Sequence, residues 1–130
     1  MAVIEAVSLR NDNGTYEKIM SWGPLTEADS GGAIEIPRFT DKTIQAYGTF
    51  DAAGAVTVYG SNNILDKAKE PSDATSSWVP VTDVDGLGNV VLVAAKKGAT
   101  ILENYTYMAC EVTAGTGVSL TVTIQGQRRV

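Results

Sequence analysis

The chain has no histidine among its 130 residues. Histidine is the usual proton acceptor beside a catalytic serine or cysteine and the commonest metal ligand, so its absence excludes Ser-His-Asp and Cys-His catalysis and leaves zinc without a ligand set. No other group of side chains has the spacing of an active site. We therefore expect no catalytic residue, no metal site, no cofactor and no enzymatic activity.

Cysteine is almost as scarce, since Cys110 is the single example. One cysteine cannot form a disulfide within the chain, which fits a reducing compartment. Cys110 lies between Met108 and Val112 in an alternating apolar pattern, where an unactivated buried thiol is inert. We predict that it is a small core residue rather than a nucleophile.

Basic residues are few, with 10 lysines and arginines against 15 acids and a net charge of −5. An acidic surface without a basic stripe repels phosphate, so nucleic acid is not an expected partner. No apolar run is long enough to span a membrane, and Glu5 stands where a secretion signal needs apolar residues, so we expect no membrane partner and synthesis in the cytoplasm. The basic pair Arg128-Arg129 is either a solvated tail or a docking contact.

Acids and glycines alternate at residues 83–89, a pattern that raises the question of a calcium site. The remaining acid of a helix-loop-helix calcium site is missing, and no glutamate follows at the required position. A turn that joins two strands is the favoured interpretation.

The chain is rich in alternation of apolar and polar residues, most clearly at residues 105–125. Successive side chains of a strand point to opposite faces, so this pattern predicts two strands, and the glycines at 115 and 117 suggest an antiparallel hairpin. One face should be core. Its members are Met108, Cys110, Val112, Val118, Leu120, Val122 and Ile124.

Weaker alternation predicts further strands. We expect a first strand at 2–9 and a second at 16–22 that together form a hairpin, with Gly23-Pro24 at the end of the second strand. A short edge strand should follow at 34–37, and a second clear hairpin should cover 42–60. Shorter strands are expected at 78–81, 90–95 and 99–103. With about eight to ten short strands and no long helix, the chain is predicted to be an all-β antiparallel β-sandwich of jelly-roll or Ig-like type, in one domain covering 1–130.

Two stretches depart from this rhythm. Residues 61–77 form the longest loop, with a possible helical turn near Leu65, and a long loop in a compact domain is the first place to seek a specific contact. Residues 90–95 are apolar on both faces. Either they are buried between two layers, or another subunit covers the face that carries Val91 and Val93.

Aromatic residues offer a further surface. Trp22, Trp78, Tyr105 and Tyr107 would suit a sugar-binding platform or a subunit contact, because flat amphipathic rings serve both. Core packing is the favoured interpretation for the two tryptophans. Tyr105 and Tyr107 fall on the polar face of their predicted strand and are expected at an interface.

The order of these features resembles a broad group of small tailed-phage virion proteins. The resemblance runs from Trp22 over most of the chain, and the insertion at 63–77 departs from the pattern. It is carried by Trp22 with Leu25, Gly31-Gly32, Ile34-Glu35-Ile36-Pro37, residues 41–50, residues 56–62, Trp78 with Thr82-Asp83 and Gly86, residues 110–117 and residues 120–124.

The resemblance implies a β-sandwich structural protein of the virion, most plausibly a capsid decoration or cement protein on the outer surface of the shell, assembled in the host cytoplasm. It implies a trimer that binds the major capsid protein. A carbohydrate-binding or host-adhesion module, or a tail or neck component, is the alternative. The candidate interface residues are Tyr105, Tyr107, Val91, Val93, Leu65, Arg128 and Arg129.

Overall fold

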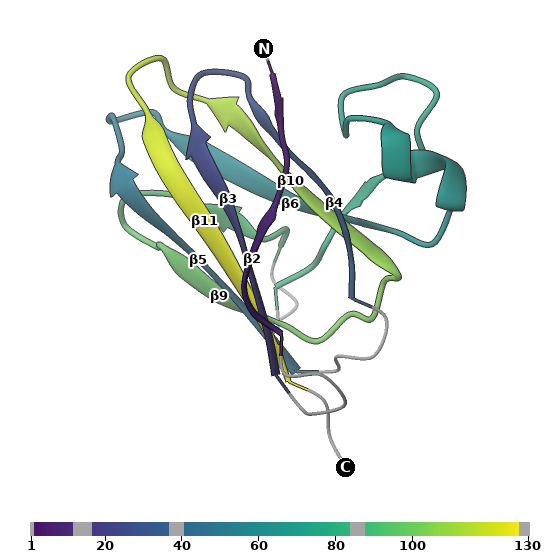
Figure 1. Cartoon of the computed structure of the whole chain (residues 1–130). Helices are drawn as coiled ribbons and strands as arrows, with labels where there is room; N and C mark the ends of the chain where they lie inside the picture. The colour runs from purple at the N-terminus through teal and green to yellow at the C-terminus, as the bar shows by residue number, and fades with distance from the viewer. Residues whose placement is uncertain (1, 12–16, 37–40, 84–87, 128–130) are drawn as a thin grey trace.

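The computed structural model describes residues 2–11, 17–36, 41–83 and 88–127, and within them it is all-β (Figure 1). These residues form eleven strands and one short 3-10 helix, η1. The elements are β1 Val3–Ile4, β2 Val7–Asn11, β3 Glu17–Leu25, β4 Ser30–Glu35, β5 Asp41–Thr49, β6 Ala55–Ser61, η1 Ile64–Ala68, β7 Val79–Pro80, β8 Val91–Leu92, β9 Gly98–Ile101, β10 Tyr107–Ala114 and β11 Ser119–Gln127.

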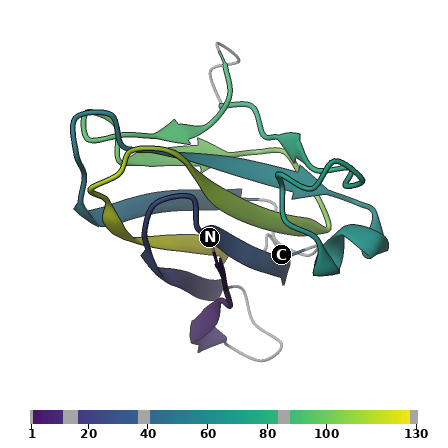
Figure 2. The ribbon, with the colours of Figure 1, turned by 90° about the horizontal axis from the view of Figure 1, so that it is seen from above.

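The strands form two sheets that pack face to face as a sandwich, which confirms the predicted fold class (Figure 2). Sheet A has the order β1-β4-β10-β6-β7, with β8 also paired to β6, and sheet B has the order β2-β3-β11-β5-β9. Every strand pair is antiparallel except β1 with β4.

Alternation along the strands decides which side chains fill the space between the sheets. On β5 the inward residues include Ile44 and Ala46, while Thr43, Gln45 and Tyr47 face outward. The predicted core face of β10 and β11 is also confirmed, because all seven of its residues are buried. Cys110 is among them, and burial raises the pKa of its thiol to about 12, as expected for an inert core residue.

Neither of the two most strongly predicted hairpins exists. β10 pairs with β4 and β6 in sheet A, whereas β11 pairs with β3 and β5 in sheet B, so residues 114–119 cross from one sheet to the other. The chain also changes sheet between β5 and β6. Two strands that face each other across a sandwich show the same alternation as two strands that pair, so the pattern cannot distinguish these arrangements.

The N-terminal part of the chain is divided between the sheets. The predicted first strand is two strands, β1 in sheet A and β2 in sheet B. The predicted hairpin with the second strand is confirmed, since β2 pairs with β3. However, β3 does not end at Gly23-Pro24 but continues to Leu25. Its register with β11 is irregular at this point, and such an irregularity accommodates a proline, which has no N–H to donate.

The predicted edge strand at 34–37 is also longer than expected. β4 begins at Ser30 and lies between β1 and β10. A Cβ at Gly31 would lie 2.6 Å from Cys110 Sγ and 2.7 Å from Trp22 Cγ, so this position needs glycine for close packing rather than for a loop. The Trp22 indole N–H donates to the Gly32 carbonyl oxygen at 2.8 Å.

Candidate functional site, a braced loop

The loop between β6 and β7 projects from one side of the sandwich (Figures 1 and 2). Its two ends are tied to one carboxylate, that of Asp66, which is fully buried. Ser61 Oγ donates to Asp66 Oδ2 at 2.6 Å, and the backbone N–H of Ser77 donates to the same oxygen at 2.9 Å. A buried carboxylate with several donors is a strong local constraint, so the loop has a fixed base.

Further hydrogen bonds fix the interior of the loop. Asn63 Oδ1 accepts from the backbone N–H of Leu65 at 3.0 Å and caps η1. Lys69 Nζ donates to the carbonyl oxygen of Thr75 at 3.1 Å. The side-chain hydroxyl and the backbone N–H of Thr75 both donate to Asp73, and these bonds, the hydroxyl first, lower the pKa of the Asp73 carboxyl.

Trp78 attaches the end of the loop to the outer face of sheet A. Its indole N–H donates to the Lys69 carbonyl oxygen at 3.0 Å, and its ring packs with Tyr107 and Ala109 in a second, smaller apolar cluster. Ala33 and Tyr59 lie at the edge of this cluster. The loop is therefore a packed part of the structure.

This rigid loop displays two aliphatic side chains to solvent. Ile64 is 70% exposed and Leu65 is 67% exposed, although both belong to η1, whose Asp66 is completely buried. Exposed apolar side chains are common when isolated, but an adjacent pair on a preformed support is suited to contact with a partner. Of the two, only Leu65 was predicted. Ile64 was missed although it precedes Leu65 directly in a polar stretch.

The other predicted interface residues do not join this pair in one exposed set. Tyr107 is only 5% exposed, so the prediction that it lies exposed on the outward face of its strand is wrong: it packs with Trp78 and Ala109. Tyr105 is half-buried, and its ring lies where a Cβ at Gly60 would stand. Burial raises the pKa of the Tyr105 phenol, whose hydroxyl donates to Glu103 Oε2 at 3.3 Å. Val91, in β8 of sheet A, and Val93 are half-buried, and Arg128 and Arg129 lie outside the described residues.

A sugar platform built from tryptophans is ruled out by burial. Trp22 is inaccessible in the main core, and Trp78 is 8% exposed in the second cluster. The alternative interpretation, core packing, is confirmed for both. An adhesion site on this protein would need other residues.

The acidic stretch at 83–89 is described only at its ends, because 84–87 lie outside the described residues. Asp83 forms an ion pair with Lys96, and its backbone N–H donates to the Gly88 carbonyl oxygen at 2.8 Å. Thr82 and Asn89 form an antiparallel bridge, as expected for a turn between strands. Within the described ranges, no group of three histidine, cysteine, aspartate or glutamate side chains is arranged to hold a metal, and no helix is long and apolar enough to cross a membrane.

Comparison with known proteins shows a similarity of fold and none of sequence family. No protein-family model and no curated protein sequence matches the chain. Among solved structures, the crystal structure of SPBc2 prophage-derived protein YomS matches with a TM-score of 0.58 over 85% of this chain and 94% of that chain. The chain shares the fold of a prophage-derived protein. Since the sequence identity is 14%, the similarity concerns the β-sandwich itself.

Proposed function

We propose that this protein is a non-enzymatic structural component of a tailed-phage particle, a decoration protein that attaches to the capsid shell through Ile64 and Leu65. The observation that carries the proposal is the exposure of this aliphatic pair on a loop held by buried hydrogen bonds. The order of sequence features, which resembles small tailed-phage virion proteins, and the fold similarity to a prophage-derived protein support it.

The energetics suit attachment by many weak contacts. Burial of one leucine or isoleucine side chain against a partner contributes roughly 1.5–3 kcal/mol. Because the loop is already ordered, little of this contribution is lost to fixing its conformation. A single pair would bind weakly, but a trimer that presents three pairs to a symmetric shell of major capsid proteins gains from effective concentration.

The proposal is tested by cosedimentation with shells assembled from the major capsid protein of the same phage. The double variant Ile64→Ser/Leu65→Ser should lose most of the binding. Leu102→Ser is the matched control, since Leu102 is a half-exposed aliphatic residue outside the loop. Wild-type binding by the double variant, or absence of binding by the wild type, would overturn the proposed attachment site.

The oligomeric state is tested separately by light scattering at micromolar concentration. We expect a trimer in which the half-buried side chains of Val91 and Val93 lie at or near the subunit contact. Substitution of both by serine should shift the population toward monomer. A wild-type monomer that also fails to bind shells would contradict the decoration role.

A further inference from the structure

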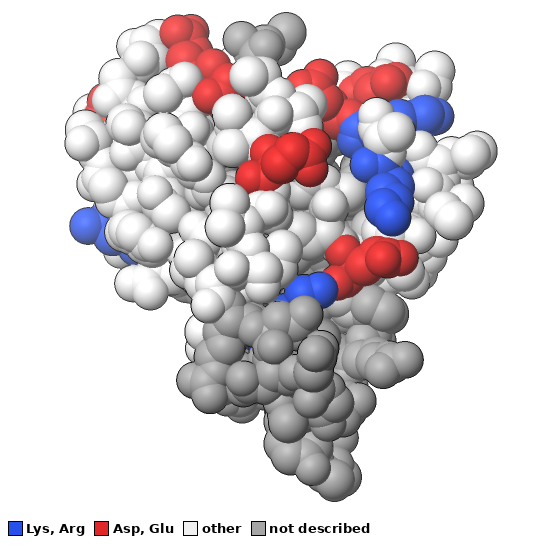
Figure 3. All heavy atoms as spheres, viewed as in Figure 1, with Lys and Arg blue, Asp and Glu red and all other residues white. Residues whose placement is uncertain are grey.

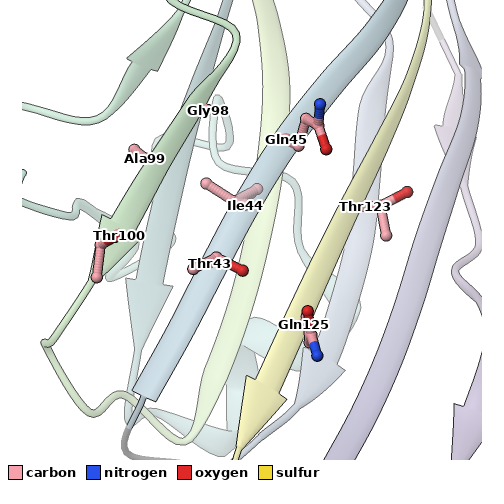
Figure 4. A pocket seen from close by; sticks show the side chains of 8 residues that line it. All are labelled: Thr43, Ile44, Gln45, Gly98, Ala99, Thr100, Thr123 and Gln125. Atoms are coloured by element: carbon pink, nitrogen blue, oxygen red, sulfur yellow. The ribbon is translucent and has the colours of Figure 1, made fainter.

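The outer face of sheet B is hollowed between β9, β5 and β11 (Figure 4). None of these strands belongs to the loop between β6 and β7 that displays Ile64 and Leu65, which we call the docking loop. The hollow has a volume of about 390 Å³. Strand register places its side chains in two rows: Thr43 lies between Thr100 and Gln125, and Gln45 lies between Gly98 and Thr123. The volume is in the range of small-molecule sites, roughly 300–1,000 Å³.

Glycine creates the open space in the second row. Gly98 pairs with Gln45, so a side chain at position 98 would stand on the same face, and its absence leaves the row open toward the sheet edge. A Cβ placed there would meet no atom closer than the Ile44 carbonyl oxygen, at 3.4 Å. The hollow can therefore be filled by substitution with little disturbance of the core.

The described residues that line this hollow carry no charge. Its polar groups are hydroxyls and carboxamides, which both donate and accept hydrogen bonds, in a protein of net charge −5. Figure 3 shows that most of the visible surface over β5, β11 and β3 is free of lysine, arginine, aspartate and glutamate. Such a surface has no counter-charge for an ionic ligand, and it offers polar groups and apolar area in similar measure.

An aromatic ring borders the hollow. Tyr47 is the next outward residue after Gln45 on β5, and it is 47% exposed. Its hydroxyl lies 3.2 Å from Thr123 Oγ1, a hydrogen bond that fixes the ring beside the lining residues. An exposed aromatic face next to neutral donors and acceptors is suited to the apolar face and the hydroxyl groups of a sugar ring.

A smaller hollow of about 210 Å³ continues the first, because Thr43, Thr100 and Gln125 line both. Its far end is formed by Asp41 and Lys42. Lys42 is buried, its Nζ donates to Asn104 Oδ1 at 3.0 Å, and burial lowers the pKa of its amine. The two hollows together form an elongated groove, and among the described residues that line it the one acid, Asp41, lies at one end.

We propose that this groove binds a neutral oligosaccharide through Thr43, Gln45, Thr123 and Gln125, with Tyr47 stacked against a sugar ring. The site would give the protein an adhesive function in addition to attachment, and it uses none of the tryptophans that the sequence suggested for that purpose. It does not depend on the docking loop.

The test is NMR titration of the full chain with maltotriose, cellotriose and chitotriose, with 3′-sialyllactose as the charged comparison. We expect saturable shifts at residues 43–47, 98–100 and 123–125 for at least one neutral trisaccharide, with a millimolar dissociation constant. Absence of saturable shifts for all three, shifts confined to other residues, or binding of sialyllactose alone would overturn the proposal.

Variants separate this site from folding and from shell attachment. Gly98→Val should fill the hollow and weaken binding by about tenfold or more, which corresponds to about 1.4 kcal/mol. Gln45→Ala should weaken it by severalfold through loss of hydrogen bonds, with the native spectrum retained. Thr49→Ala, on the same strand outside the hollow, should bind as the wild type, as should Ile64→Ser/Leu65→Ser. Unchanged binding by both Gly98→Val and Gln45→Ala would place the ligand elsewhere.

Discussion

Asp51 accepts a hydrogen bond from the backbone N–H of Gly117, with 2.8 Å between Oδ2 and the nitrogen. The same oxygen accepts from the N–H of Thr116 at 2.9 Å. Asp51 lies in the connection from β5 to β6, and its donors lie in the connection from β10 to β11. One carboxylate therefore joins two of the connections by which the chain crosses between the sheets. Gly115, with φ of +100°, gives the second crossing the backbone conformation that it needs.

Asp51→Asn should make the sandwich less stable at neutral pH and less sensitive to acid. The backbone N–H groups, that of Gly117 first, lower the pKa of the Asp51 carboxyl in the folded protein. The unfolded value is about 3.9, so the stabilisation by this group is present above that pH and is lost as pH falls through the lower folded value. Urea unfolding across acidic pH checks this. An identical acid dependence in wild type and variant would contradict it.

The two crossings also explain which parts of the fold were predictable. Alternation identified the inward residues of β10 and β11 correctly because burial depends on the face of a strand. Alternation did not identify the strands with which β10 and β11 pair, because the segments that contain Val112 and Val118 would show the same alternation in a hairpin. The interactions that settle the pairing, such as Asp51 with Gly117, join residues 66 positions apart in sequence.

Close packing at Gly31 was equally hidden from the sequence, because Cys110 and Trp22, which it contacts, are distant along the chain. Gly31→Ala should destabilise the protein by about 1–3 kcal/mol, since the added methyl meets Cys110 and Trp22 and overpacks the core. Gly88→Ala is the control, because a Cβ at Gly88 meets no atom of the described residues within 4 Å. Thermal unfolding measures both. Equal midpoints for the two variants would show that the core at Gly31 can expand.

Two parts of the candidate site were predicted from the sequence, the loop at 61–77 and Leu65. The burial of Tyr107 was not, because it depends on packing against Trp78, which the alternation of β10 does not reveal. The uncharged lining of the larger hollow on sheet B follows from the outward positions of β5 and β11. Its shape, however, depends on the pairing of Gly98 with Gln45.

Asp66→Asn should loosen the docking loop while preserving the volume of the side chain. In the variant, the side-chain NH₂ group would face either the Ser61 hydroxyl or the Ser77 backbone N–H, both of which donate to the carboxylate in the wild type. Two donors cannot bond to each other, and an unsatisfied buried polar group costs about 1–3 kcal/mol. We expect faster proteolysis within 62–77 and weaker shell binding. Asp73→Asn is the control, since Asp73 is exposed and bonds only locally to Thr75, and its effect should stay within about 0.5 kcal/mol.

If Asp66→Asn is cleaved no faster than Asp73→Asn, the loop is held by Trp78 rather than by the carboxylate. In that case Ile64 and Leu65 would keep their positions in the variant, and shell binding should also be retained. Proteolysis and binding are therefore expected to change together.

Tyr107→Ala distinguishes burial from an exposed interface. If Tyr107 faced a partner, the variant would fold normally and assemble poorly. Because the ring packs against Trp78 and Ala109, we expect instead a loss of about 3 kcal/mol in unfolding free energy, at the lower end for truncation of a large buried aromatic residue. Tyr107→Phe keeps the ring and should be close to wild type. Urea unfolding followed by tryptophan fluorescence reports both, because Trp78 lies in the same cluster, and a stable Tyr107→Ala variant would show that the cluster does not hold the loop.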